Sequence, residues 1–227
     1  MSRIAILSDA HLLIQAERFR DENYRSPRGE ISLQNFRKVV SQVIAERPEA
    51  VILAGDMFDE REKGGEWVAD SEAAKYWPDI RNELKRLMEC TKYGIYALRG
   101  NHDSAPMLKE LQDYMGNGFH FVRDEEAEIS GHRIYFMETR YRQGNYEIPE
   151  EELPKGGEML IMHETLPWGM PGLEEEVWQE LGQRFSLILN GHMHHYAHAP
   201  LDIPHLYALP ALIPSRELKG NFTVEYH

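Results

Sequence analysis

The strongest constraint on the fold is an alternation of short apolar runs with amphipathic segments over residues 1–100. Apolar runs of strand length stand at Arg3–Ser8, Ala50–Ala54 and Gly94–Leu98. The segments between them, 32–47 and 71–88, carry apolar residues at helical spacing. This β-α-β-α-β order predicts a parallel sheet covered by helices, with ligands at the carboxyl ends of its strands.

The remaining elements are expected from caps, breakers and periodicity. We expect Ser32 to cap the first helix, Pro48 to follow its end, and Pro78 to mark a break or a new first turn in the second. The second half is expected to contain a helix at Pro106–Met115, an antiparallel ribbon of His120–Val122, Ala127–Ile129 and Arg133–Glu138, a polar loop at 140–157, a strand at Met159–Met162, a helix at Leu173–Phe185, a strand at Leu187–Asn190, and short strands near Leu206 and at Phe222–Tyr226. No repeat or linker is visible in the sequence, so a single domain over 1–227 is predicted.

Composition narrows the class of protein. The net charge of −13 argues against a protein that coats DNA through phosphate neutralisation, although bound metals and local arginines still allow a nuclease. The single cysteine, Cys90, is typical of a reducing compartment. Because no apolar run is long enough for a membrane span and no signal peptide is visible, we expect a cytoplasmic protein without membrane contact.

Polar side chains follow five of the expected strands. They are Asp9 and His11, Asp56, Asn101 and His102, His163, and His192 and His194. Carboxylates, imidazoles and one amide oxygen, without a thiolate, suit a borderline divalent ion such as Mn, Fe, Zn or Co. Leaving His102 aside, these ligands are too many for one ion and suit two ions that share one ligand. Two such ions can hold a hydroxide for in-line attack and clamp a phosphoryl group, with His102 placed to protonate the leaving oxygen.

The ordered motifs D-A-H, G-D-M-F-D, G-N-H-D, M-H-E and G-H-M-H resemble the five motifs of the calcineurin-like metallophosphoesterase superfamily. The resemblance spans residues 9–194 and implies a four-layer α/β/β/α sandwich of two mixed sheets flanked by helices. It also implies the site: one ion on Asp9, His11 and His194, a second on Asn101, His163 and His192, Asp56 between them, His102 as proton donor, and Asp103 orienting that imidazole.

Neighbouring polar and aromatic residues are interpreted more conservatively. Asp59 is interpreted as a supporting or turn residue, and His195 as a residue of the rim or the substrate site. Four other histidines, His120, His132, His198 and His205, are expected on the surface or in the core. The aromatic residues Trp67, Tyr76 and Trp77 are expected to pack on helices rather than to stack on bases.

Within the superfamily, G-D-M-F-D followed by G-N-H-D is similar to the SbcD-type DNA repair nuclease, as is the tail Pro210–Glu225. This resemblance implies DNA as substrate, Mn²⁺ as the favoured metal and an SbcC-like ATPase as a partner. SbcD proteins continue into a capping domain and an ATPase-docking segment, neither of which is expected from this sequence. A homodimer would be a way to compensate. Basic residues of the first long loop, Arg18, Arg20, Arg25 and Arg28, are expected to contact the phosphate backbone.

Two other classes of function remain open from the sequence. One is a small-molecule phosphatase or cyclic-nucleotide phosphodiesterase on the same core. The other is a non-catalytic scaffold, which is disfavoured because the expected ligands and His102 are all present.

Overall fold

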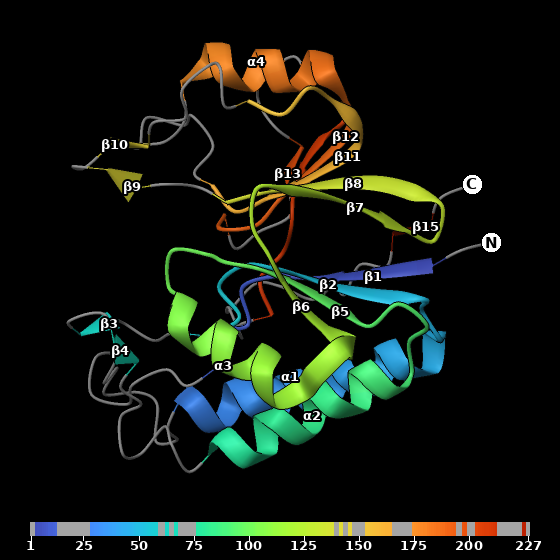
Figure 1. Ribbon diagram of the computed structural model, residues 1–227, viewed down its shortest axis with the longest axis vertical. Helices are drawn as coiled ribbons and strands as arrows, with labels where there is room; N and C mark the ends of the chain where they lie inside the picture. Colours follow the sequence, from blue (N-terminus) through green and yellow to red (C-terminus); the bar gives the residue numbers. More distant parts are fainter. Residues whose placement is uncertain are drawn as a thin grey trace.

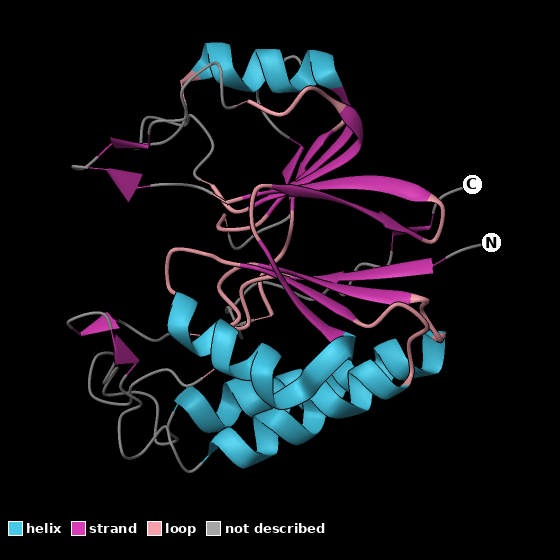
Figure 2. Ribbon diagram, in the orientation of Figure 1, coloured by secondary structure: helices cyan, strands magenta, loops and turns pink. Residues whose placement is uncertain are grey.

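Two β-sheets lie face to face between layers of helices (Figures 1 and 2). The computed structural model describes residues 3–12, 28–58, 62–63, 66–67, 76–138, 141–142, 145–146, 153–164, 174–193, 197–198, 203–212 and 224–225. Helices α1, α2 and α3 cover the outer face of one sheet, and α4 covers the outer face of the other. This is the four-layer α/β/β/α arrangement that the sequence predicts.

The first sheet has the strand order β15-β1-β2-β5-β6. Its strands are β1 (Arg3–Leu7), β2 (Ala50–Ala54), β5 (Ile95–Leu98), β6 (Phe119–Val122) and β15 (Val224–Glu225). The first four run parallel, and β15 pairs antiparallel with β1. The prediction that His120–Val122 belongs to an antiparallel ribbon is therefore wrong. The chain returns through α3 to the starting end of β5, and a strand reached by such a crossover pairs parallel.

The second sheet has the order β13-β14-β12-β11-β8-β7. Its strands are β7 (Glu125–Ile129), β8 (His132–Met137), β11 (Gly157–Met162), β12 (Phe185–Asn190), β13 (Ala197–His198) and β14 (Leu206–Ala208). The hairpin of β7 and β8 is confirmed, with both turn residues, Ser130 and Gly131, at positive φ. Strands β8, β11, β12 and β14 run parallel, so this sheet is mixed and its parallel strands end on one edge.

The helices and the small hairpins refine the predicted boundaries. The helices are α1 (Arg28–Glu46), α2 (Trp77–Glu89), α3 (Ala105–Met115) and α4 (Glu175–Arg184), with a 3-10 turn, η2, at Gly116–Gly118. The predicted cap at Ser32 is wrong, because the helix begins at Arg28, directly after Pro27 in the sequence, and Ser32 is buried inside it. Pro78 lies in the first turn of α2. Two-residue strands lie in segments predicted as loops: β3 (Glu62–Lys63) with β4 (Glu66–Trp67), and β9 (Tyr141–Arg142) with β10 (Asn145–Tyr146).

The core has three parts that follow the layers. In β2 all residues are buried; Val51 and Leu53 pack with the helices, whereas Ala50, Ile52 and Ala54 pack between the sheets. Such burial on both faces explains why the sequence of this strand is continuously apolar. The inter-sheet core fixes how the two sheets meet, and therefore how the strand ends approach one another. No helix among the described residues has the length and apolar character needed to cross a bilayer.

Candidate metal centre

The candidate site lies where the carboxyl ends of strands from both sheets meet. Loops after β1, β2 and β5 of the first sheet supply Asp9, His11, Asp56, Asn101 and His102, and loops after β11 and β12 of the second sheet supply His163 and His192. The sequence predicted this convergence from the polar tip that follows each strand. Asp9, His11, Asp56 and His163 are buried, so these polar groups lie inside the protein.

The side chains lie within a few ångströms of one another. His163 Nε2 is 3.1 Å from Asp56 Oδ2 and 4.0 Å from Asp9 Oδ1, and His11 Nε2 is 3.7 Å from Asp56 Oδ2. Asn101 Oδ1 and His192 Nδ1 are 2.8 Å apart. The structure thus brings together all the predicted ligands that it describes.

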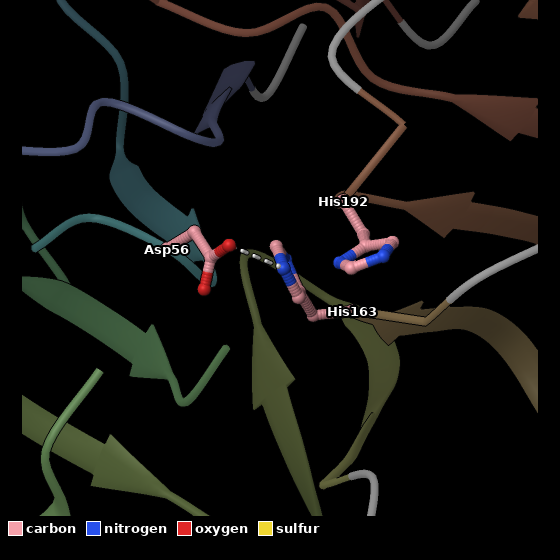
Figure 3. A group of neighbouring side chains, drawn as sticks. All are labelled: Asp56, His163 and His192. Atoms are coloured by element: carbon pink, nitrogen blue, oxygen red, sulfur yellow. Dashed lines mark ion pairs between the residues drawn. The ribbon is translucent and has the colours of Figure 1, made fainter. Parts of the chain in front are cut away.

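Two overlapping groups of donor atoms can each hold an ion. One consists of Asp9, His11 and Asp56, and the other of Asp56, His163 and His192; within each group the ligand atoms lie within 4.8 Å of one another. Figure 3 shows the imidazoles of His163 and His192 beside the Asp56 carboxylate, with the ion pair between His163 and Asp56 dashed. Asp56 belongs to both groups, which is the arrangement that a bridging carboxylate requires.

The backbone at these strand ends is strained. Asp9, His11, Asp56 and His192 have φ of 53°, 42°, 49° and 72°, in the left-handed region that residues with a Cβ rarely adopt. Hydrogen bonds over-determine this conformation: Asp9 N donates to Gly55 O, His11 N to Asp56 O, and His192 N to Asp9 Oδ2. Strain held in this way is concentrated at functional sites in proteins.

Close packing around the ligands depends on glycine. Gly55 has a φ of 88°, and a Cβ there would lie 2.4 Å from Nδ1 of His163. A Cβ on Gly100 would lie 2.2 Å from Oδ1 of Asp56. The glycines of the G-D-M-F-D and G-N-H-D motifs therefore let the loops approach the ligands directly.

Comparison with known proteins agrees with this geometry. A family model described as calcineurin-like phosphoesterase matches residues 2–196. The chain belongs to the calcineurin-like phosphoesterase family. Members of this family hydrolyse phosphoric esters with the help of two metal ions.

A solved structure shares this fold at low sequence identity. A dimetal phosphatase from Danio rerio aligns with a TM-score of 0.54 and 14% identity, over 93% of this chain and 88% of that protein. A novel archaeal phosphodiesterase aligns with a TM-score of 0.46 and 14% identity, over 92% of this chain and 84% of that protein. No curated protein matches the chain.

The electrostatics of the site fit the divalent ions that the family uses. Burial by itself lowers the pKa of His163, but the Asp56 and Asp9 carboxylates outweigh it and raise that pKa to about 10. Burial by itself raises the pKa of Asp56, whereas His163 and His11 hold it well below its usual range. The buried carboxylates therefore stabilise a positive charge between them. Together with a donor set of oxygen and nitrogen atoms, this makes the site suitable for divalent cations.

The predicted proton donor and its neighbour lie on the loop after β5. His102 is half-buried; its backbone N–H donates to Asp56 Oδ1 at 2.8 Å, and its ring centroid is 5.0 Å from that of His11. The Asp103 carboxylate accepts the N–H groups of Phe58 and Gly100 at 2.8 and 2.9 Å, so it joins the loops after β2 and β5. Burial and the neighbouring Asp56 carboxylate raise the pKa of Asp103 to about 7. That Asp103 also orients the His102 imidazole stays a prediction.

Two buried polar side chains support the site without having been assigned a role from the sequence. The Ser8 hydroxyl donates to Asp9 Oδ2, and the Asn190 amide bonds to the backbone of Glu164 and Gly191. The only signal in the sequence was a polar residue at the end of an otherwise apolar run, I-L-S and L-I-L-N. Their partners depend on which strand ends become neighbours, and the sequence did not specify that.

Several predicted residues lie outside the described part of the chain. These are the ligand His194, the neighbouring residues Asp59 and His195, and the loop arginines Arg18, Arg20 and Arg25. Among the other histidines, His120 stacks on Tyr96, His132 lies 3.5 Å from Glu158, and His205 Nε2 bonds to Gly182 O. Of the three aromatic residues, Tyr76 and Trp77 pack in the helical core as expected, whereas Trp67 lies in β4 rather than on a helix.

Proposed function

We propose that the protein is a two-metal-dependent phosphodiesterase that acts on DNA, like the core of the SbcD-type nuclease. The observation that carries the proposal is the pair of donor groups that share Asp56 where the strand ends of the two sheets meet. In this proposal Asp9, His11 and His194 hold one ion, and Asn101, His163 and His192 hold the other. Mn²⁺ is the favoured metal, with Fe, Zn and Co also suited to these donors.

The residues of the chain have separate tasks in this reaction. When bound, a pair of divalent ions activates water and neutralises charge on the phosphoryl group. Asp9 and Asp56 are held by backbone N–H groups of the neighbouring loops, so their carboxylates are positioned before substrate arrives. His102 stands on the same loop as Asn101 and is placed to give its proton to the leaving oxygen.

The DNA assignment is supported by the sequence motifs rather than by the fold. G-D-M-F-D and G-N-H-D are similar to the SbcD pattern, and Arg18, Arg20, Arg25 and Arg28 follow the first metal motif. The same assignment implies a cytoplasmic protein with an SbcC-like ATPase partner or a homodimeric assembly. The net charge of −13 favours the second candidate, a phosphodiesterase or phosphatase for small molecules, which need no extended basic surface.

Cleavage of DNA separates these candidates. We would measure Mn²⁺-dependent cleavage of end-labelled single- and double-stranded DNA by the wild type, by His102→Ala and by Asp56→Asn, with bis(p-nitrophenyl) phosphate as a generic diester. The proposal expects cleavage by the wild type and loss of cleavage in both variants. Hydrolysis of the generic diester without cleavage of DNA would overturn the nuclease assignment in favour of a small substrate. A protein without bound metal and without turnover would be a non-catalytic scaffold.

A further inference from the structure

Asn190, the last residue of β12, has a fully buried side chain that makes three hydrogen bonds to backbone groups. Its Oδ1 accepts the N–H of Glu164 at 2.8 Å. Its Nδ2 donates to the carbonyl oxygens of Glu164 and Gly191, at 2.7 and 3.0 Å. One amide therefore joins the chain that leaves β11 to the chain that leaves β12.

These bonds continue the parallel pairing of the two strands beyond its last backbone pair. The strands pair as far as Met162 with Asn190, and the N–H of Gly191 donates to Met162 O at 3.0 Å. Beyond that point the Asn190 side chain takes the place of a strand partner for Glu164. The backbone of Asn190 also accepts the N–H of Leu209 at 2.7 Å, which ties the end of β14 to the same place.

The hydrogen bonds of Asn190 lie next to His163 and His192, which are candidate ligands of the same ion. His163 directly precedes Glu164, and His192 directly follows Gly191. Their rings lie edge to face with centroids 5.2 Å apart. Figure 3 shows the two side chains next to one another. Neither histidine contacts Asn190 in the bonds described above, so Asn190 acts on them through the backbone.

The chemistry of the site requires an amide here rather than another polar group. A carboxylate could accept from Glu164 N but would place a second anionic oxygen 2.7 Å from a carbonyl oxygen, in a buried position. An apolar side chain would leave one N–H and two carbonyl groups without this partner. Asparagine supplies the one acceptor and the two donors that the three groups need.

We propose that Asn190 is a positioning residue that sets the distance between His163 and His192 and thereby the affinity for the second ion. The inference rests on the proposed two-metal function. Because altering a residue that orients metal ligands typically lowers metal affinity, Asn190→Asp is expected to weaken binding of the second ion about 10- to 100-fold. The first ion, which has Asp9, His11 and the shared Asp56 of the first sheet among its ligands, is expected to weaken much less, although His194 follows the same strand as Asn190.

The test is a titration of the metal-free protein with Mn²⁺. Binding is measured by calorimetry and by the electron paramagnetic resonance signal of coupled Mn²⁺ pairs. The variants are Asn190→Asp and the milder Asn190→Ser, which decides the matter if the first does not fold. The control is Leu189→Ala, the preceding residue of the same strand, which is buried between the sheets and points to the opposite face. It is expected to lower the melting temperature while both ions bind as in the wild type.

The outcomes distinguish the positioning role of Asn190 from the proposed two-metal function. Loss of the coupled signal in the Asn190 variants, with the first ion retained, supports the positioning role. Wild-type affinities for both ions, or equal weakening of both, would overturn it while leaving the two-metal function intact. A wild type that binds fewer than two ions would instead overturn the proposed function.

Discussion

At the scale of single residues, His102 is expected to act in the chemical step without being a metal ligand. His102→Ala is expected to keep both ions and to lower kcat about 10²- to 10⁴-fold, because a general acid contributes about that much. The loss should be larger for a diester with a phenyl leaving group than for one with a 4-nitrophenyl group, since the latter leaves without protonation. Steady-state kinetics on the two diesters, with calorimetry of Mn²⁺ binding, checks this. Equal losses on both substrates would rule out His102 as the proton donor.

A second residue-scale prediction concerns Gly55, whose missing side chain makes room for His163. Gly55→Ala combines positive φ with a Cβ 2.4 Å from the imidazole, so we expect the free energy of unfolding to fall by about 2–4 kcal/mol and Mn²⁺ binding to weaken. Gly131→Ala is the matched control, because its φ of 85° is similar and nothing lies within 4 Å of the added Cβ. Urea unfolding and Mn²⁺ titration of both variants check the prediction. If the two variants behave alike, backbone strain alone explains the glycine.

At the scale of elements, Asp103 connects the loop after β2 to the loop after β5. Asp103→Ala leaves the buried N–H groups of Phe58 and Gly100 without this acceptor, each at a cost of about 1–3 kcal/mol, partly offset by removing a buried carboxylate. We expect the melting temperature to fall by about 4–8 °C, as for a loss of about 2 kcal/mol in a domain of this size. Calorimetric melting checks this, with the exposed Asp113→Ala on α3 as control. An unchanged melting temperature would instead leave Asp103 the role of orienting the His102 imidazole.

The elements also show what could be read from the sequence. The strand β2 was predictable because burial on both faces requires a continuous run of apolar residues. The polar residues that follow the parallel strands were predictable as site residues because the carboxyl ends of such strands converge. The sheet to which β6 belongs was not predictable, because a strand of only four residues, F-H-F-V, has the same pattern in either sheet. The start of α1 was missed because Ser32 has the residue type of a cap, whereas Gly29, a poor helix former, lies inside the helix. The bonds of Asn190 depend on the register of β11 with β12, which local pattern does not encode.

At the scale of the whole molecule, the candidate site joins the two halves of the sandwich. Asp9, His11 and Asp56 come from the first sheet, and His163 and His192 come from the second. An ion bound in the group of Asp56, His163 and His192 would therefore have ligands from both sheets. Metal binding should therefore stabilise both sheets rather than a single loop.

Metal binding is thus expected to raise the melting temperature of the whole domain. A ligand at 100 times its Kd stabilises the folded state by about 2.7 kcal/mol, which corresponds to about 5–10 °C per ion in a domain of this size. Scanning calorimetry in Mn²⁺ and in chelator measures the shift, and Asp56→Asn, which weakens both donor groups, should lose most of it. Amide hydrogen exchange should show slower exchange in β11 and β12 as well as in β1 and β2 when Mn²⁺ is bound. Protection confined to the first sheet would contradict a site shared between the sheets, because His163 and His192 would then contribute nothing to binding.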